Sequence, residues 1–264
     1  MAQRATAQQQ PRDGQVAGTQ TIRRAFMVLN LVRDEGGEMG VVEMANRLGL
    51  NLSTTHRIAR GLVAEGYLSQ GEGRERYRLG PQSLLLGQAA QRVLGMDAAR
   101  PVLERLAERT EESVNLGLLD GHHAVVVQRI ESTQPLRFSM EVGSRVELHA
   151  TSMGKALLAR NDELAAFLAG HEESLEALTA KTHSTVTSLR ADLAEIAERG
   201  WSVDDEESVE GVRCVGAPIL DADGQARAAV AVQAPAVRMP EKRLAQLGPV
   251  LVATATELAR VVPL

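Results

Sequence analysis

The chain has 264 residues, of which 44% are hydrophobic and 24% are charged. A domain usually holds about 150 residues, so this length predicts one large domain or two modest ones, each with its own core. The composition excludes wholesale disorder and a minimal disulfide scaffold. No apolar run approaches the roughly 20 residues that cross a bilayer, and the N-terminus has no apolar stretch for export, so we expect a cytoplasmic protein without a membrane segment.

Cysteine and aromatic content exclude further classes of site. Cys214 is the only cysteine, which excludes an internal disulfide and a multi-cysteine metal cage, and we expect neither a metal nor a cofactor. Aromatic residues make up only 2%, too few for the stacking platforms that bind single-stranded nucleic acid. Residues 1–80 carry 11 Arg against 8 Asp plus Glu, whereas the remaining chain has a net charge of −8. This N-terminal basic excess favours duplex DNA as a partner.

The N-terminal third predicts three helices and a hairpin. Apolar residues recur at helical spacing from Thr21 until Gly36, and a shorter amphipathic run ends at Gly49. Asn51 or Ser53 can cap the next helix. The predicted elements, in chain order, are a disordered tail at 1–18, helices at 21–35, 39–48 and 51–65, and a two-stranded hairpin with strands at 67–69 and 77–79.

The rest of the chain predicts a linker helix and a second domain that mixes strands and helices. Helical spacing continues from 81 to about 110, with interruptions expected near Gly95 and Pro101; this stretch comprises a linker helix at 82–98 and the first helix of the second domain. Strands are expected at 113–119, 123–131, 136–142, 214–220 and 226–233, and helices at 152–159, 162–168, 188–199 and 240–262. The fold class is therefore α+β, with a DNA-binding domain at 19–81, the linker at 82–98 and a second domain at 99–264.

Helix, glycine turn, helix and hairpin in this order predict a winged helix-turn-helix, whose second motif helix enters the major groove of DNA. Judged alone, a polar helix face is more often solvated, but its position between a glycine turn and a basic hairpin favours DNA contact. The candidate DNA-binding residues can reach base edges or phosphates; they are Asn51, Ser53, Thr54, Thr55, His56, Arg57 and Arg60 on the helix, and Arg74 and Arg76 on the wing.

Three separated motifs carry a family resemblance. The N-terminal third contains VEMA at 42–45, STTHRI at 53–58 and GYL at 66–68. The second domain contains HATSMGKALLA at 149–159, and an acidic run at 204–207 that leads to GVRC at 211–214. Together these segments resemble the IclR-type transcriptional regulators, over nearly the whole chain after the tail.

The resemblance implies a homodimer or a dimer of dimers on a pseudo-palindromic operator, with the linker as dimerisation element. It also implies a GAF-like effector-binding domain with an antiparallel sheet. The implied effector-binding residues are Ser152, Met153, Gly154, Asp204, Cys214, Ala231 and Gln233. Family members that bind 2-oxo acids often have serines on the last strand, where this chain has Ala231 and Gln233. A small organic acid is still the default effector, with the amide of Gln233 and the backbone N–H groups near Gly154 as expected anion donors.

Two other functions are compatible with the sequence. Cys214 as nucleophile and His149 as base would make an enzyme with a DNA-targeting domain, although no nucleophile elbow, P-loop or dinucleotide fingerprint accompanies them. An architectural DNA binder without a ligand would not need so large a second domain. Residue by residue, we expect Lys155 to be a structural cation on a helix surface with a packed stem. We expect the charge run at 204–207 to be a solvated loop unless one carboxylate turns inward to a ligand.

Overall fold

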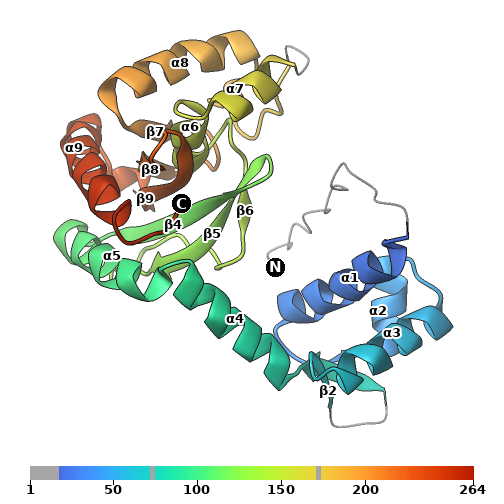
Figure 1. Ribbon diagram of the computed structural model, residues 1–264. Coiled ribbons are helices and arrows are strands. Elements are labelled where there is room, and N and C mark those ends of the chain that lie inside the picture. Colours follow the sequence, from blue (N-terminus) through green and yellow to red (C-terminus); the bar gives the residue numbers. More distant parts are fainter. Residues whose placement is uncertain (1–17, 72–74, 171–173) are drawn as a thin grey trace. The chain divides into compact units, whose positions relative to one another are not determined.

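The computed structural model describes residues 18–71, 75–170 and 174–264, in two compact units, one that ends at Ala90 and one that begins at Gln91 (Figure 1). The predicted tail lies outside the described residues, except for Gly18. Among the described helices, none is long and apolar enough to span a membrane.

The N-terminal unit is a winged helix-turn-helix. Helices α1 (Gln20–Glu35), α2 (Val41–Leu48) and α3 (Leu52–Ala64) pack on a small antiparallel sheet of β1 (Met39–Gly40), β2 (Leu68–Gln70) and β3 (Arg76–Leu79), in the order β1-β3-β2. The turn between α2 and α3 requires Gly49, whose φ of +63° is a left-handed conformation. The apolar core of this unit comprises Val28, Val32, Met39, Val41, Met44, Ile58, Ala59, Leu68 and Tyr77.

Two details of this unit differ from the sequence prediction. Met39 and Gly40 were expected to begin the second helix, but they pair with Tyr77 and Arg76 as a third wing strand. A two-residue strand is too short to show a period of two, so the apolar pattern of α2 extended over it. On α3 the buried face is formed by Thr55, Ile58 and Ala59, while the predicted Leu62 and Val63 are only half-buried.

A broken helical segment follows the wing. Helix α4 (Pro81–Val93) contains no buried residue, and α5 (Met96–Thr110) begins after Gly95. The predicted interruption at Gly95 is confirmed: its φ is +68°, and a Cβ there would lie 2.1 Å from the carbonyl oxygen of Val261. The interruption predicted at Pro101 is wrong, because α5 continues through it.

The C-terminal unit is built on a six-stranded antiparallel sheet in the order β6-β5-β4-β9-β8-β7. Its strands are β4 (Ser113–Asp120), β5 (His123–Ile130), β6 (Arg145–Val146), β7 (Ser202–Asp205), β8 (Val212–Leu220) and β9 (Ala226–Pro235). On one face the core includes residues of α5 and α9 (Glu241–Leu258). On the other it includes residues of α6 (Ser152–Leu158), α7 (Asp162–Ala169) and α8 (Val186–Arg199), so the sheet lies between two helical layers (Figure 1).

The sheet confirms the α+β class with a predominantly antiparallel second domain, but two strand predictions were wrong. Residues 136–142 form no strand, and the pairing at this edge is made by the short β6. The strand β7 was missed because its acidic sequence, Ser-Val-Asp-Asp, is typical of a solvated loop. A short 3-10 helix, η1 (Ala236–Arg238), joins β9 to α9.

Candidate DNA-binding and effector sites

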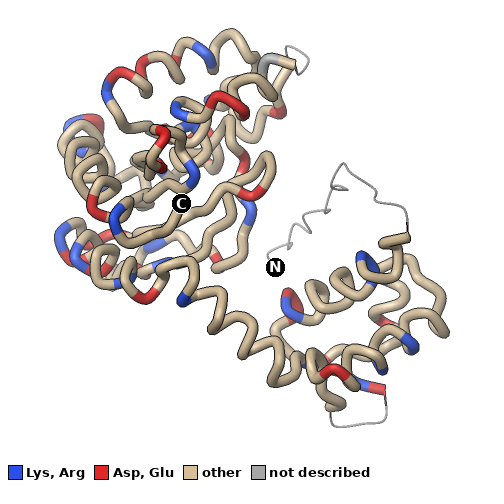
Figure 2. The backbone as a smooth tube through the Cα atoms, viewed as in Figure 1, with Lys and Arg blue, Asp and Glu red and all other residues tan. Residues whose placement is uncertain are grey.

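The first turns of α3 present a polar and basic surface. Asn51, Ser53, Arg57 and Arg60 are exposed, and Thr54 and His56 are half-buried. Helix α3 carries basic but no acidic residues (Figure 2). In the described part of the chain neither of its arginines has a hydrogen-bond or ion-pair partner, so both guanidinium groups are available to an anionic ligand.

Thr55 does not belong to this exposed surface. Its side chain is fully buried, and its hydroxyl donates to the carbonyl oxygen of Asn51 at 3.1 Å. The reason is helical geometry: Thr55 lies three and four residues before Ile58 and Ala59, which form the buried face of α3. The expectation that it contacts DNA was therefore wrong about its orientation.

The wing offers fewer free cations than its sequence suggested. Arg74 lies outside the described residues. Arg76 is exposed, but it donates to the carbonyl oxygen of Glu38 at 2.8 Å and its Nε lies 3.7 Å from the Glu38 carboxylate. Arg78 forms a second ion pair with the same carboxylate at 3.6 Å. Glu38 thus holds both arginines at the wing, where they can still face a phosphate.

All seven residues expected to bind the effector are buried in the C-terminal unit. Strand register places Asp204 beside Cys214, and Cys214 beside Gln233, on the sheet face that α6 covers. Ala231 lies on the same face, two residues before Gln233 on β9. The structure therefore brings the expected residues of β7, β8 and β9 together beneath Ser152, Met153 and Gly154 of α6.

Two glycines allow α6 to lie this close to its neighbours. A Cβ at Gly216 would lie 2.9 Å from the carbonyl group of Ser152, and one at Gly154 would lie 2.3 Å from the Cα of Leu148. The start of α6 is also capped: the amide of Gly154 donates to the hydroxyl of Thr151 at 3.1 Å. This amide is therefore already bonded, contrary to the expectation that it binds an anion.

Cys214 is a buried thiol rather than an activated nucleophile. Burial raises its pKa well above the usual value, and the nearby Asp204 carboxylate raises it further. Gln233 and Ser152 lie close enough to the thiol to lower its pKa in part, whereas His149 bonds through Nε2 to the carbonyl oxygen of Glu176 at 2.8 Å. Neither residue has the partner that the enzyme alternative requires.

Asp204 carries the most perturbed carboxyl group of the site. Burial raises its pKa to about 6, against the opposing effect of hydrogen bonds from Ser208 and from two backbone amides. The charge run at 204–207 is thus not a solvated loop, since the side chains of Asp204 and Glu207 are both buried.

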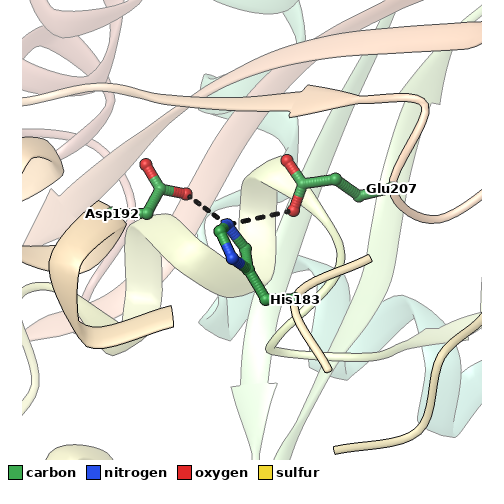
Figure 3. Close-up of side chains that lie close together, drawn as sticks. All are labelled: His183, Asp192 and Glu207. Atoms are coloured by element: carbon green, nitrogen blue, oxygen red, sulfur yellow. Dashed lines mark ion pairs between the residues drawn. The ribbon is translucent and has the colours of Figure 1, made fainter. Parts of the chain in front are cut away.

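Lys155 lies inside the protein, not on a helix surface, and is 1% exposed. Its ammonium group donates to Asp192 Oδ2 and to Glu207 Oε1, both at 2.6 Å. His183 lies against the same carboxylates, with Nε2 at 3.4 Å from Asp192 and 3.8 Å from Glu207 (Figure 3). Those three side chains offer atoms spaced for a metal, but the lysine ammonium already bridges both carboxylates, so the arrangement fits an internal ion-pair cluster better than a cation site.

Sequence reasoning missed Arg129 and Asn115, which lie on the same sheet face. Asn115 is paired in register with Arg129 on one side and with Ala231 on the other. Arg129 Nη1 donates to Asn115 Oδ1 at 2.7 Å and to Gln233 Oε1 at 3.1 Å. The available signal was an arginine near the end of a strand that is otherwise mostly apolar, but a bulge between Leu116 and Gly117 shifts the register, so alternation alone could not assign its face.

A winged helix-turn-helix joined to a sheet domain with a buried polar site is the architecture of a transcriptional regulator that responds to a ligand. Residues 21–72 match the IclR helix-turn-helix domain, and residues 88–260 match the domain described as bacterial transcriptional regulator IclR C-terminal. The chain belongs to the IclR family of bacterial transcriptional regulators.

The curated relatives are transcriptional regulators, and the similarity extends over most of each protein. The HTH-type transcriptional regulator BhcR of Paracoccus denitrificans (strain Pd 1222) is 35% identical over 243 residues, covering 92% of this chain and 87% of that protein. The transcriptional repressor IclR of Escherichia coli (strain K12) is 30% identical over 251 residues, covering 94% and 90%. These relatives identify a regulator and give no support to the enzyme alternative.

Solved structures share the fold. The IclR protein of Thermotoga maritima matches with a TM-score of 0.73 and 29% identity, over 91% of this chain and 97% of that one. An IclR homolog from Microbacterium hydrocarbonoxydans, solved in complex with 4-hydroxybenzoate, matches with a TM-score of 0.76 at 21% identity, over 91% and 99%.

Proposed function

We propose that this regulator binds a pseudo-palindromic DNA operator as a homodimer, and that a small organic acid bound in its second domain changes this binding. The proposed domains are the DNA-binding domain at 19–81, the linker at 82–98 and the effector-binding domain at 99–264. The observation that carries the DNA-binding part is the basic surface of α3, where Arg57 and Arg60 are exposed and have no ion-pair partner among the described residues, and where the helix itself carries no acidic residue.

Roles on the DNA are assigned by position. Arg57, with Ser53, Thr54 and His56, lies in the first turns of α3, the part of a recognition helix that reads base edges. Asn51, Arg60, Arg74 and Arg76 are assigned to phosphates, which orient the protein without reading sequence. Thr55 receives no role, because it is buried.

A homodimer is supported by α4. This helix exposes Leu84, Leu85, Leu86 and Val93, each more than half exposed, and it has no buried residue. An exposed apolar helix of this kind is normally covered by a partner. A second copy is the partner that a two-fold operator requires, since two recognition helices must lie about one helical turn of DNA apart, or a multiple of that distance.

The effector site is proposed at the buried polar face beneath α6, with Ser152, Met153, Gly154, Asp204, Cys214, Ala231 and Gln233 around the ligand. Its donors include the side-chain amides of Asn115 and Gln233 and the hydroxyl of Ser152, and burial raises the pKa of its carboxyl group, Asp204, to about 6, so this group takes up a proton more readily than an exposed aspartate. A protein of the same fold was solved with 4-hydroxybenzoate, which is a carboxylic acid.

The test is selection and footprinting with the full-length protein. Fragments of the source genome are incubated with the protein, bound fragments are recovered, and their footprints are mapped with and without a panel of carboxylic acids, amino acids and neutral amides. We expect a palindromic footprint that at least one acid weakens, strengthens or moves. Binding that is salt-sensitive but equal on all fragments would instead indicate an architectural DNA binder and contradict the proposal.

A further inference from the structure

The buried guanidinium group of Arg129 is the unexplained charge of the C-terminal unit. Its side chain is only 4% exposed. In the described residues its one ion-pair partner is Glu131, whose Oε1 lies 3.9 Å from Arg129 Nε, beyond hydrogen-bond distance. Glu131 is itself 53% exposed and is also paired with Arg137. An exposed, shared carboxylate at this distance screens a buried charge poorly.

The hydrogen bonds of Arg129 fix its orientation without neutralising it. Nη1 donates to the side-chain oxygens of Asn115 and Gln233, and Nη2 donates to the carbonyl oxygen of Phe138. All three acceptors are neutral. Nε is buried, and it has no hydrogen-bond partner among the described residues. One edge of the guanidinium therefore keeps an unused donor, while the opposite end is held by two amides.

Several charged groups bear on this arginine. Burial lowers its pKa, the carboxylate of Glu131 raises it, and the like charge of Arg137 lowers it. Asp204, the buried carboxyl group of the same sheet face, is not among its hydrogen-bond or ion-pair partners. Arginine nevertheless stays protonated in proteins, so the site holds a positive charge that is short of a counter-ion.

Arg129 lies on the face where the effector is proposed. Asn115 links it in register to Ala231, and Gln233, its second amide partner, lies beside Cys214. The segment that supplies the Phe138 carbonyl runs from 131 to 144 without regular helix or strand. A ligand carboxylate that competes for Nη2 would therefore displace one neutral acceptor rather than a stretch of sheet.

We propose that Arg129 is the anion anchor of this regulator: its free Nε, with Nη2, binds the carboxylate of the effector, and Asn115 and Gln233 position the guanidinium. This inference rests on the proposed function and deepens it, because it restricts effectors to molecules with a planar oxyanion. The geometry of two parallel N–H donors matches a carboxylate, which an isosteric neutral amide cannot reproduce.

The test compares acids with their amides on the full-length protein. The probes are formate, acetate, benzoate and 4-hydroxybenzoate against formamide, acetamide, benzamide and 4-hydroxybenzamide, at ionic strength matched with sodium chloride. Binding is followed by the thermal midpoint and by the rate at which N-ethylmaleimide alkylates Cys214, the only cysteine. We expect at least one acid to raise the thermal midpoint and slow the alkylation of Cys214. The amide of that acid should bind more weakly by a factor of about ten or more.

Variants then assign the effect to one side chain. Arg129→Met should weaken binding of the acid by about tenfold or more and abolish the preference for the acid over its amide. Arg129→Lys should retain part of that preference. Arg145→Met is the matched control, since this arginine is exposed on β6 and paired with Asp120. If Arg129→Met does not fold, Arg129→Lys and the comparison of acids with amides on the wild type still test whether Arg129 binds the carboxylate.

Three results would overturn the inference: an amide that binds as tightly as its acid, an acid that binds Arg129→Met as tightly as the wild type, or no acid binding at all. The proposed function fails separately. An acid that moves the footprint equally in wild type and Arg129→Met would support the proposed function and contradict the role of Arg129. An acid whose binding requires Arg129 but that never changes the footprint would support the role of Arg129 and contradict the proposed function.

Discussion

Asp204 shows how one buried carboxyl group links the site to pH. It is fully buried, and its pKa in the folded protein is about 6, above the usual 3.8. The folded state therefore holds this proton over a range of pH in which the unfolded chain has released it. Stability from this group is present below about pH 4, is lost as pH rises to about 6, and is then constant.

Replacing Asp204 with Asn should remove this pH dependence. The difference in unfolding free energy, variant minus wild type, should rise between about pH 4 and pH 6 by an amount on the order of 3 kcal/mol, and then level off. Urea unfolding of both proteins across this range measures it, and the difference cancels the other titrating groups. Parallel curves would show that Asp204 has an ordinary pKa.

Lys155 should be a much larger stability determinant than an exposed lysine. Lys155→Met leaves the buried Glu207 and the mostly buried Asp192 without their bridging cation, which is expected to cost about 3–5 kcal/mol of unfolding free energy. Lys181→Met is the control, because that lysine is exposed and its pairs with Asp205 and Glu206 lie at the surface. Equal urea midpoints for the two variants would contradict a structural role for the cluster.

For single residues, the sequence predicted which side chains lie together better than it predicted how buried they are. The motif around Gly154 and Cys214 indicated which residues to group, and the strand register does bring Cys214, Gln233 and Asp204 together. The burial of Lys155 could not be predicted, because its partners Asp192 and Glu207 lie 37 and 52 residues away along the chain. Long-range ion pairs leave no local pattern.

Among the elements, substitutions on α3 and on the wing should change DNA-binding affinity in different ways. Arg57→Ala is expected to weaken operator binding by roughly 1–3 kcal/mol while leaving random duplex almost unchanged, because base contacts carry the discrimination. Titrations on both duplexes measure this, with Arg33→Ala as control, since Arg33 lies on α1 and pairs with Asp34. An equal loss on both duplexes would contradict base reading by Arg57.

Arg76→Ala should instead lower affinity on all duplexes and flatten the dependence of log affinity on log salt concentration. Its effect should be modest, because Glu38 already holds this guanidinium in the free protein. Binding to operator and random duplex over a range of salt concentrations measures both quantities. A loss confined to the operator would mean that the wing reads sequence.

Helix α4 should carry self-association. Leu84→Glu places a charge at a leucine that is 63% exposed, so it should leave the monomer folded but weaken the dimer. Sedimentation velocity against protein concentration measures the shift, and Gln88→Glu, an exposed polar residue of the same helix, is the control. An unchanged dimer would place the interface elsewhere.

Long periodic elements were predictable, and short edge elements were not. The first helix was expected at 21–35 and is observed at Gln20–Glu35, because its apolar spacing spans four turns and glycine ends it. The strands β1 and β7 have two and four residues, too few for a period. Residues 136–142 alternate like a strand but form none, because the edge of the sheet pairs with 145–146 instead.

The whole molecule combines a helix-turn-helix unit with a unit whose candidate effector-binding residues are buried. Figure 2 shows both signs of charge over the C-terminal helices, and the chain outside residues 1–80 has a net charge of −8, which does not favour DNA binding. An effector can alter DNA binding only if it binds two states of the protein with different affinity. Linkage then requires reciprocity: operator DNA must change the affinity for the effector by the same factor.

The most direct measurement is therefore operator affinity with and without the acid that binds best, paired with acid affinity with and without operator. The account predicts that both change by the same factor, about 5-fold to 150-fold for a typical coupling free energy, and that Arg129→Met abolishes the response to acid while keeping operator binding. Operator affinity that stays constant at saturating acid would contradict it.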